Sequence, residues 1–337
     1  MKQTKQMMLS FKKKEINSNM DINILLILQE FRNGAGSCLV SFMTKMSFIG
    51  EMNTVLIIMA LIYWCISKEF GAYLLMGWSG SRVVNGLLKV TACVYRPWIR
   101  DARIVPDSKA LAEATGYSFP SGHSMNGAAL YGGGAIRKEL GKTLRITLGI
   151  IVVLIAFSRN FLGVHTPQDI LVGMFSGLLV MWLTFKLLEW VKAHPEKDIL
   201  VMCAGIGAAV SVAVFAAVKS YPVDYDEAGK ILVDGAKMAN DTYKGVGWCM
   251  GFLLGWVLEK RYIGFSTDVP MLTRITRLAT GLISYYAVHL ILAPLVKSGI
   301  SGAAGTIVSC FIEMFYAVFV FPLCIKHFEH PTSITSD

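Results

Sequence analysis

Three short stretches of the sequence concentrate polar residues where apolar runs begin or end. They read KVTACVYRP (residues 89–97), PSGH (residues 120–123) and SRNFLGVHTPQD (residues 158–169). Charged side chains near the ends of membrane helices are costly unless they are paired or hydrated, so they mark functional sites by default. We therefore expect the three stretches to meet in one site.

The polar residues of these stretches match a tetrahedral dianion. Lys89, Arg96 and Arg159 supply three cations. Arginine forks bind two phosphate oxygens at once, and lysine adds a point charge. Ser121 and Gly122 stand at the start of an apolar helix, whose first backbone N–H groups and dipole favour an anion. Gly122 allows close approach of the backbone and Ser121 adds a hydroxyl donor, so we predict that these five residues bind phosphate.

Three further residues predict phosphoryl transfer. His165 is followed four residues later by Asp169, whose carboxylate can hold one ring nitrogen protonated and leave the other free to attack phosphorus. His123 would protonate the leaving oxygen and return as the base that activates water. The plainer interpretation of Asp169 is an N-cap of the helix that follows, and the two roles are compatible. The cations and the helix dipole already neutralise the phosphate, so we expect no metal and no cofactor.

In this order the motifs resemble the type 2 phosphatidic acid phosphatase (PAP2) family, which includes lipid phosphate phosphatases, glucose-6-phosphatase and soluble vanadium haloperoxidases. The resemblance rests on K-x6-R-P, P-S-G-H and S-R-x5-H-x3-D and covers about residues 50–190. It implies a six-helix core. It also implies phosphate binding by Lys89, Arg96, Ser121, Gly122 and Arg159, with His123 as acid, His165 as nucleophile and Asp169 as its orienting partner. The first motif ends RPWIRD rather than RPRP, so a second arginine, at the entrance, would have to be Arg100.

The composition indicates an all-α polytopic membrane helix bundle. Of 337 residues, 54% are hydrophobic and 16% are charged, and the mean hydropathy is +0.53. Several runs of about 18–22 residues carry few or no charges, the length of a membrane-crossing helix, and the strict alternation of a β-barrel is absent. The net charge of +9 does not indicate nucleic-acid binding, because the basic residues are dispersed among loops. The seven cysteines form no C-x-x-C pair and lie mostly in apolar runs, as small hydrophobic residues do.

The apolar runs divide the chain into four parts. We predict a basic tail (1–20), interfacial helices or one tilted span (21–50), a PAP2-type catalytic core (51–195) and additional transmembrane helices (196–330). A polar segment from Lys219 to Asp241 interrupts the spans; its acidic part, residues 224–241, is interpreted as a solvated outer loop, with screening of headgroups as the alternative. About three further helices follow the six-helix core. The predicted spans are residues 53–67, 71–90, 121–137, 143–160, 169–190, 199–218, 243–259, 275–296 and 302–325.

The distribution of charge predicts which face the site occupies. The loops alternate between a face rich in Lys and Arg, with Lys138, Lys142 and Lys192 among them, and a face that holds all three motif stretches. Because basic loops stay in the cytoplasm, we predict an integral protein of a bacterial plasma membrane with an extracytoplasmic active site. The basic tail conflicts with this orientation if residues 21–50 do not cross.

The site and the membrane setting together predict a phosphatase. Its substrate would be an amphiphilic phosphate or diphosphate whose tail stays among the membrane lipids: phosphatidate, phosphatidylglycerol phosphate, a polyprenyl diphosphate or a sphingoid phosphate. The alternatives are a phosphotransferase with a lipid or sugar acceptor, and a phosphatase of a water-soluble sugar phosphate. A silent scaffold or transporter would be expected to lose a histidine or a cation of the site, and none is missing.

Overall fold

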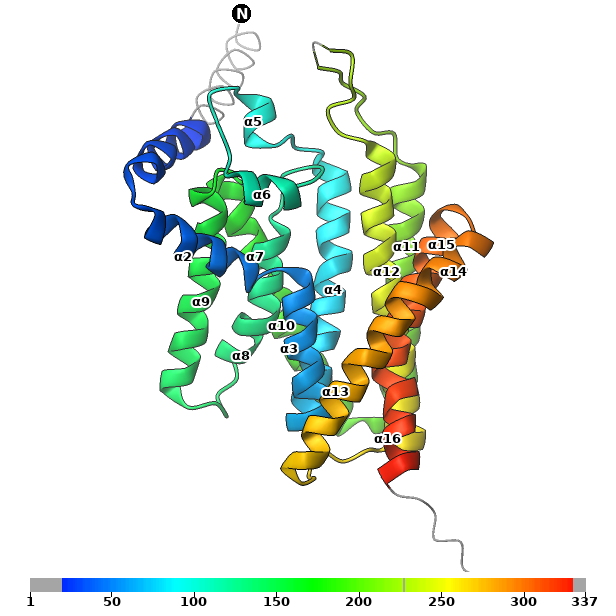
Figure 1. Cartoon of the computed structure of the whole chain (residues 1–337). Helices are drawn as coiled ribbons and strands as arrows, with labels where there is room; N and C mark the ends of the chain where they lie inside the picture. Colours follow the sequence, from blue (N-terminus) through cyan, green and yellow to red (C-terminus); the bar gives the residue numbers. More distant parts are fainter. Residues whose placement is uncertain (1–19, 227, 330–337) are drawn as a thin grey trace, which may run out of the picture.

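A computed structural model describes residues 20–226 and 228–329, and every regular element in these two ranges is a helix (Figure 1). The predicted all-α polytopic membrane bundle is thereby confirmed. The predicted basic tail lies outside the described residues, apart from Met20. After a helix over residues 20–34, the main helices are α2 (Ser37–Phe48), α3 (Met52–Leu61), α4 (Lys68–Ala92), α5 (Pro97–Arg100), α6 (Ser108–Glu113), α7 (Gly122–Gly127), α8 (Gly133–Ala135), α9 (Lys142–Phe161), α10 (Pro167–Ala193), α11 (Asp198–Val218), α12 (Gly235–Leu258), α13 (Met271–Ala287), α14 (Ala293–Gly299), α15 (Gly302–Phe315) and α16 (Phe321–Glu329).

Several of these helices continue into one another through single π-helical turns. Such turns extend α3 (Ile62–Ile66) and α12 (Glu259–Ile263) and join α7 to α8 (Ala128–Gly132), α13 to α14 (Val288–Leu292) and α15 to α16 (Tyr316–Val320). A π turn adds a residue to the helical repeat without ending the helix. The predicted spans 275–296 and 302–325 are therefore each one helical segment.

Five helical segments of the described chain are long and apolar enough to cross a membrane, and a sixth if α2 and α3, bent by 57°, form one span. The five are Lys142–Phe161, Pro167–Ala193, Pro195–Val218, Met271–Gly299 and Gly302–Glu329. Helices are also present at the remaining predicted spans. However, α4 and α12 carry polar residues, and the segment from α7 to α8 is short. These helices are less apolar because they contribute to the interior of the bundle, as described below.

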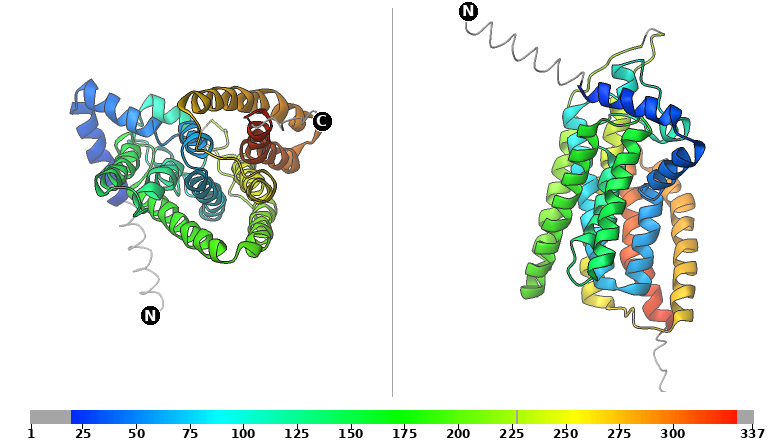
Figure 2. Two further views of the ribbon diagram at one scale, coloured as in Figure 1. Left: turned by 90° about the horizontal axis from the view of Figure 1, so that it is seen from below. Right: turned by 90° about the vertical axis from the view of Figure 1, so that its left-hand side faces the viewer.

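The helices α4 and α12 pack directly against each other near the middle of the bundle (Figure 2). Gly245 of α12 faces the backbone of Arg82, and a Cβ added to this glycine would lie 3.1 Å from the carbonyl carbon of Arg82. One turn further along, Gly86 of α4 faces Thr242. Small residues let membrane helices approach closely. The C-terminal part of the chain is thereby brought against the polar face of α4.

The N-terminal helix over residues 20–34 lies at the end of the bundle that carries α5 and α6 (Figure 1). Asp21 pairs with Arg100 over 2.8 Å, and the side-chain oxygen of Gln29 accepts a hydrogen bond from the backbone of Val105 over 2.7 Å. These bonds attach the helix to α5 and to the loop that follows α5. Its predicted position at the membrane interface stays a prediction.

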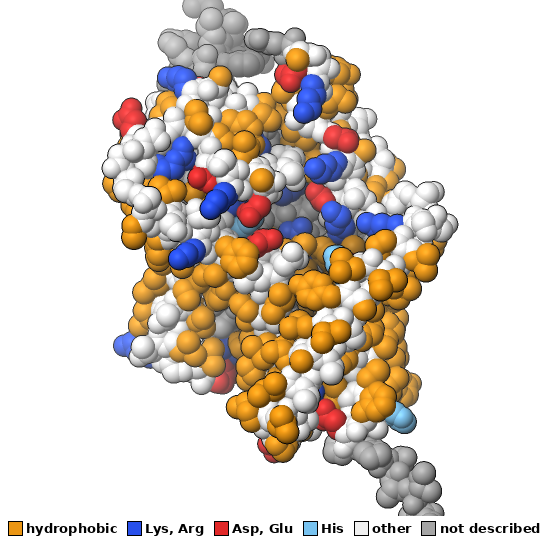
Figure 3. Space-filling model, in the orientation of Figure 1, with side chains coloured by type: hydrophobic (Ala, Val, Ile, Leu, Met, Phe, Trp, Pro, Cys, Tyr) orange, Lys and Arg blue, Asp and Glu red, His pale blue; other side chains and the backbone are white. Residues whose placement is uncertain are grey.

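The outer surface of the long helices is apolar. Exposed side chains include Leu171, Phe175 and Trp182 on α10, and Ile283 and Leu290 on the segment from α13 to α14. In Figure 3 the charged side chains gather over the upper part of the visible face, above a mainly hydrophobic surface. A surface of this kind is suited to lipid rather than to water.

Candidate active site

One face of α4 contributes four residues to a polar cavity at the end of the bundle that carries α6. Arg82, Asn85, Gly86 and Lys89 recur at intervals of three and four residues, which places them on one side of the helix. The Nζ atom of Lys89 donates a hydrogen bond to the carbonyl oxygen of Tyr117 over 2.8 Å. Lys89 therefore lines the cavity and also ties α4 to the loop that precedes PSGH.

Arg96 joins the loop after α4 to the turn before α10. It is 5% exposed, and its guanidinium donates to the carbonyl oxygens of Thr115, Gly116 and Val164, each over 3.0 Å. Its Nη1 atom also lies 2.9 Å from Nε2 of His165. Burial lowers the pKa of Arg96 to about 9, so the side chain remains a cation at neutral pH.

His165 lies in the turn between α9 and α10 and is oriented by Asp169. Its Nδ1 atom lies 3.3 Å from Oδ2 of Asp169. The same carboxylate oxygen accepts hydrogen bonds from the hydroxyl of Ser118 over 2.5 Å and from the backbone N–H of Thr166 over 2.8 Å. Thr166 is the N-cap of α10 and forms a capping box with Asp169. The N-cap alternative for Asp169 is therefore wrong in detail, because Asp169 is the third residue of the helix.

The surroundings of His165 keep its imidazole neutral. Burial lowers its pKa well below the ordinary value of 6.5, and the charge of Arg96 lowers it further, whereas Asp169 acts in the opposite direction. A carboxylate only accepts hydrogen bonds, so we assign the ring proton to Nδ1, which faces Asp169. The Nε2 atom then carries the lone pair, which accepts a hydrogen bond from Nη1 of Arg96.

His123 and Arg159 both lie beside a carboxylate from α6, that of Glu113. Its Oε2 atom lies 3.5 Å from Nε2 of His123 and 3.8 Å from Nη1 of Arg159. The interaction with His123 lowers the pKa of Glu113, against the opposing effect of partial burial. Arg159 is 1% exposed and donates a hydrogen bond to the hydroxyl of Ser47 on α2. Glu113 itself is partly exposed, so it stands at the mouth of the cavity.

The PSGH stretch begins the helical segment from α7 to α8, as predicted for a span start. Ser121 is the N-cap of α7, where its hydroxyl accepts from the backbone of Ser124 over 3.4 Å. Ser121 is fully buried and is not among the residues that line the cavity, so its contact with phosphate stays a prediction. Gly122 does line the cavity, and Nη1 of Arg82 lies 3.7 Å from the position that a Cβ on Gly122 would take.

These residues converge on one cavity of about 150 Å³. The predicted residues that line it are Lys89, Arg96, Gly122, His123, Arg159 and His165, while Asp169 lies behind His165. Among the lining residues, Nε of Arg82, Nε of Arg159 and Nε2 of His123 are buried without a hydrogen-bond partner. Buried polar atoms are nearly always hydrogen-bonded, so these three nitrogens favour a ligand with several acceptor oxygens.

The three motif stretches do not account for the whole lining of the polar cavity. The lining also includes Arg82, Asn85, Glu113, Met238, Asp241 and Thr242. Arg82 and Asn85 could have been found, because they share a helical face with Lys89. The prediction that the polar loop extends to Asp241 is wrong. Helix α12 already begins at Gly235, and the side chain of Asp234 caps its first turn. Asp241 therefore lies within a helix and reaches the cavity. Glu113 gave no signal in the sequence.

Arg100 lies apart from this cluster. It pairs with Asp21 through contacts of 2.8 Å and 3.1 Å, and it is not among the residues that line the cavity. A contact of Arg100 with substrate at the entrance stays a prediction.

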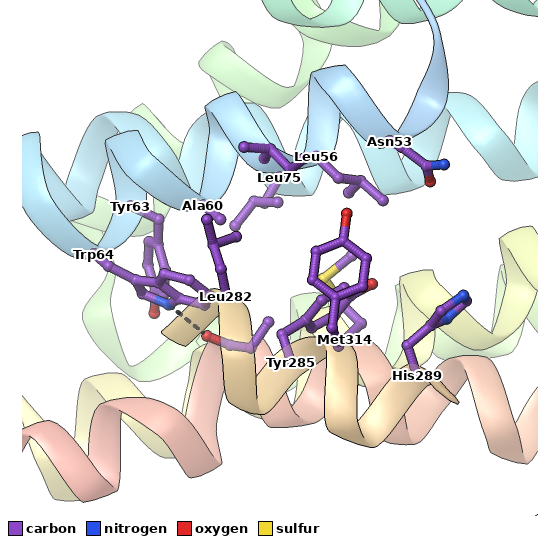
Figure 4. Close-up of a pocket in the computed structure, with 13 residues that line it drawn as sticks. Asn53, Leu56, Ala60, Tyr63, Trp64, Leu75, Leu282, Tyr285, His289 and Met314 are labelled. Carbon is purple, nitrogen blue, oxygen red and sulfur yellow. Dashed lines mark hydrogen bonds between the residues drawn. The ribbon is translucent and has the colours of Figure 1, made fainter. Parts of the chain in front are cut away.

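A second cavity, of about 80 Å³, lies between α3, α4, α13 and α15 (Figure 4). Its lining is mainly apolar and includes Trp64, whose ring N–H donates to the carbonyl oxygen of Ala317 over 2.9 Å. At one end stands His289, whose Nδ1 atom lies 2.8 Å from the carboxylate of Glu313. None of the predicted site residues, all of which are described, lines this cavity. We therefore assign the chemistry to the polar cavity.

Two family matches cover more than half of the chain. Residues 70–193 match the PAP2 superfamily, and residues 243–331 match the PAP2 superfamily phosphatase, transmembrane extension. All three motif stretches fall in the first range, and most of α12 falls in the second. The chain belongs to the PAP2 superfamily.

The chain is similar to named members of this superfamily over part of its length. It is 36% identical to phosphatidylglycerophosphatase B of Bacillus subtilis over 135 residues, which are 38% of this chain and 62% of that protein. It is 36% identical to an undecaprenyl-diphosphatase of Sulfolobus acidocaldarius over 93 residues, 25% of this chain and 39% of that protein. The matches thus span less than two thirds of either relative. The crystal structure of the first transmembrane PAP2 type phosphatidylglycerolphosphate phosphatase from Bacillus subtilis matches at 28% identity and a TM-score of 0.42, covering 51% of this chain and 86% of that one.

Proposed function

We propose that the chain is an integral-membrane phosphatase that hydrolyses a lipid phosphate or diphosphate through a phosphohistidine intermediate, without a metal ion. The observation that carries this proposal is the convergence of two histidines and several cations on one cavity, with buried nitrogens that lack partners. The functions for which the two relatives are named, those of a phosphatidylglycerophosphatase and an undecaprenyl-diphosphatase, support an amphiphilic phosphate as substrate.

In the first step, Nε2 of His165 attacks phosphorus. A phosphate oxygen takes over the Nη1 donor of Arg96, which frees the Nε2 lone pair. The phosphorus–nitrogen bond forms, the ester bond breaks, and His123 gives its proton to the leaving oxygen. Asp169 holds the proton on Nδ1 and stabilises the positive charge that the ring acquires.

In the second step, water releases the phosphate. His123, now neutral, takes a proton from water, whose oxygen bonds to phosphorus as the phosphorus–nitrogen bond breaks. The products are inorganic phosphate and a neutral His165. Glu113, 3.5 Å from His123, partly offsets the burial and the charge of Arg159, which disfavour the charged form of that imidazole, and so supports the protonated form that donates in the first step and is restored in the second. Lys89 and Arg159 stabilise the charge on the phosphoryl oxygens in both steps.

We further propose that the cavity opens on the extracytoplasmic side of a bacterial plasma membrane. The turn between α8 and α9, which contains Lys138 and leads to Lys142 at the start of α9, lies at the opposite end of the bundle from α6 (Figure 1). A cytoplasmic position for this basic turn is favoured by the distribution of charge in membrane proteins. The substrate headgroup would then enter from the outer leaflet.

The proposal is tested with the purified full-length chain in detergent, assayed with EDTA against a panel of lipid phosphates and diphosphates. We expect phosphate release that resists EDTA, is inhibited by orthovanadate and is lost in His165→Ala. His194→Ala, an exposed histidine at the end of α10, is the matched control and should retain activity. Radiolabelled phosphate should be trapped on the wild type but not on His165→Ala. A strict magnesium requirement, or activity in His165→Ala, would contradict the mechanism.

A further inference from the structure

Arg82 is a cation of the cavity that lies outside all three motifs and that the mechanism above does not use. It stands two helical turns before Lys89, on the same face of α4. Its Nη1 atom lies 3.7 Å from the Cβ position of Gly122, so its guanidinium reaches the beginning of α7. Arg82 is therefore close to the place that we assign to the transferred phosphoryl group.

The other cations of the cavity are already bonded to the protein, and Arg82 is not. Lys89 donates to Tyr117, Arg96 donates to three carbonyl oxygens, and Arg159 donates to Ser47. Within residues 20–226 and 228–329, Arg82 forms no hydrogen bond or ion pair, and its Nε atom is buried without a partner. A guanidinium has five N–H donors and stays charged, so an acceptor with several oxygens fits this position.

The wall beside Arg82 comes from the first two turns of α12, which lead into the transmembrane extension matched from residue 243. Because α12 crosses α4 at Gly245 and Arg82, it places Asp241 and Thr242 in the lining of the cavity. Asp241 is paired with Lys244 over 2.7 Å, so this wall adds little net negative charge to repel an anion. The three motif cations already match one phosphate dianion, which leaves Arg82 as an additional cation on the side of α12.

We infer that Arg82 and the α12 wall form a second anion subsite, which binds the leaving phosphate of a lipid diphosphate. This inference rests on the proposed function. Nε2 of His165 bonds to the terminal phosphorus, the bond from that phosphorus to the bridging oxygen breaks, and the bridging oxygen stays on the lipid monophosphate with the electron pair. A cation placed at that oxygen stabilises the charge as it develops. A monophosphate ester has no second phosphate for Arg82 to bind and depends on the proton from His123 instead.

The test compares two substrates that share one tail, farnesyl phosphate and farnesyl diphosphate, on the purified full-length chain. Arg82→Gln should lower kcat/KM for the diphosphate by about 10- to 100-fold and for the monophosphate by less than about 3-fold, the range expected for one lost charge-assisted contact. Arg82→Lys retains a positive charge at this position. Its loss of kcat/KM should again be greater for the diphosphate than for the monophosphate, but smaller than the loss in Arg82→Gln. Arg103→Gln, an exposed arginine paired with Asp101, is the matched control and should leave both rates unchanged.

Two inhibitors probe the subsites without turnover. Arg82→Gln should weaken inhibition by inorganic pyrophosphate and leave inhibition by orthovanadate, which fills only the first subsite, unchanged. Equal losses on both substrates would assign Arg82 to the transferred phosphate and overturn the inference, as would unchanged rates or a wild type that accepts only the monophosphate. A folded wild type that hydrolyses neither substrate nor any lipid phosphate of the panel would contradict the proposed function itself.

Discussion

Nη1 of Arg96 lies 2.9 Å from Nε2 of His165, the ring nitrogen that is free to act as a nucleophile. The same guanidinium, which comes from the loop after α4, donates to carbonyl oxygens of the loop between α6 and α7 and of the turn before α10. Arg96 therefore fixes the two motif stretches relative to each other. In the proposed mechanism it also links substrate binding to activation, because a phosphate oxygen that takes the Nη1 donor releases the lone pair of His165.

Arg96→Lys is expected to lower kcat/KM by about 100-fold or more, because an ammonium cannot make the forked contacts of the guanidinium. It also leaves buried carbonyl oxygens unpaired, which should lower the free energy of unfolding by about 1–3 kcal/mol. Steady-state kinetics and thermal unfolding measure the two effects. Arg103→Lys, at an exposed position, is the control. Wild-type kinetics in Arg96→Lys would show that the fork is not needed.

Asp169→Asn is expected to lower kcat by about 10²- to 10⁴-fold, because an amide in place of the carboxylate lets the ring proton move to Nε2 and removes the negative charge opposite the imidazolium. The substitution keeps an oxygen for the capping box with Thr166, so helix α10 should remain folded. Circular dichroism checks the fold, and rapid-quench kinetics measure formation of the phosphoenzyme. Ser118→Ala, which removes one hydrogen bond to the same carboxylate, should cost much less. A phosphoenzyme formed at the wild-type rate in Asp169→Asn would rule out the orienting role.

The sequence allowed the motif residues to be predicted because their spacing places them at helix ends, where charge is rare unless it has a function. It also allowed the apolar spans to be predicted, because nothing but a helix satisfies the backbone of such a run in lipid. The role of α12 could not be predicted in this way. Its first two turns are polar because they face the cavity rather than lipid, and so they resembled the loop that precedes them. Glu113 was missed because its pairing with His123 depends on how α6 folds back over α7, which no periodicity encodes.

With a lipid diphosphate, whose leaving phosphate needs no proton from His123, the rate of phosphoenzyme formation should stay constant as the pH falls from about 8 to 6, the range in which an ordinary imidazole becomes protonated. Burial first, and the charge of Arg96 second, lower the pKa of His165 well below 6.5, so its neutral form persists in acid. The rate should fall only when the pH approaches that lowered pKa. Rapid-quench measurements across this range provide the test. Arg96→Gln removes the positive charge that lowers the pKa of His165, so the rate of phosphoenzyme formation should begin to fall at a higher pH. A wild-type rate that halves near pH 6.5 would mean that the pKa of His165 is not lowered in the folded protein.

Glu113→Gln is expected to lower kcat for a lipid monophosphate by about 10-fold or more, because the carboxylate favours the charged form of the general acid His123. The loss should grow as the pH rises, since the acid must keep its proton, and should be small for a diphosphate, whose leaving phosphate needs no proton. Glu139→Gln, an exposed carboxylate paired with Arg137, is the matched control. A uniform loss on both substrates at every pH would instead point to a structural role of Glu113 at the cavity mouth.

Gly245→Leu is expected to destabilise the protein and to lower its activity together, although residue 245 does not line the cavity. A Cβ at this position would lie 3.1 Å from the backbone of Arg82, so a larger side chain must push α12 away from α4. Overpacking of this kind costs about 1–3 kcal/mol of unfolding free energy, which thermal unfolding in detergent can measure. Because Arg82 and Asp241 sit on the two helices that separate, the loss of kcat/KM should be greater for farnesyl diphosphate than for farnesyl phosphate. Gly207→Ala, on α11 with no atom within 4 Å of the added Cβ, should change neither quantity. If Gly245→Leu is destabilised but keeps full diphosphatase activity, the packing of α12 against α4 does not contribute to the active site.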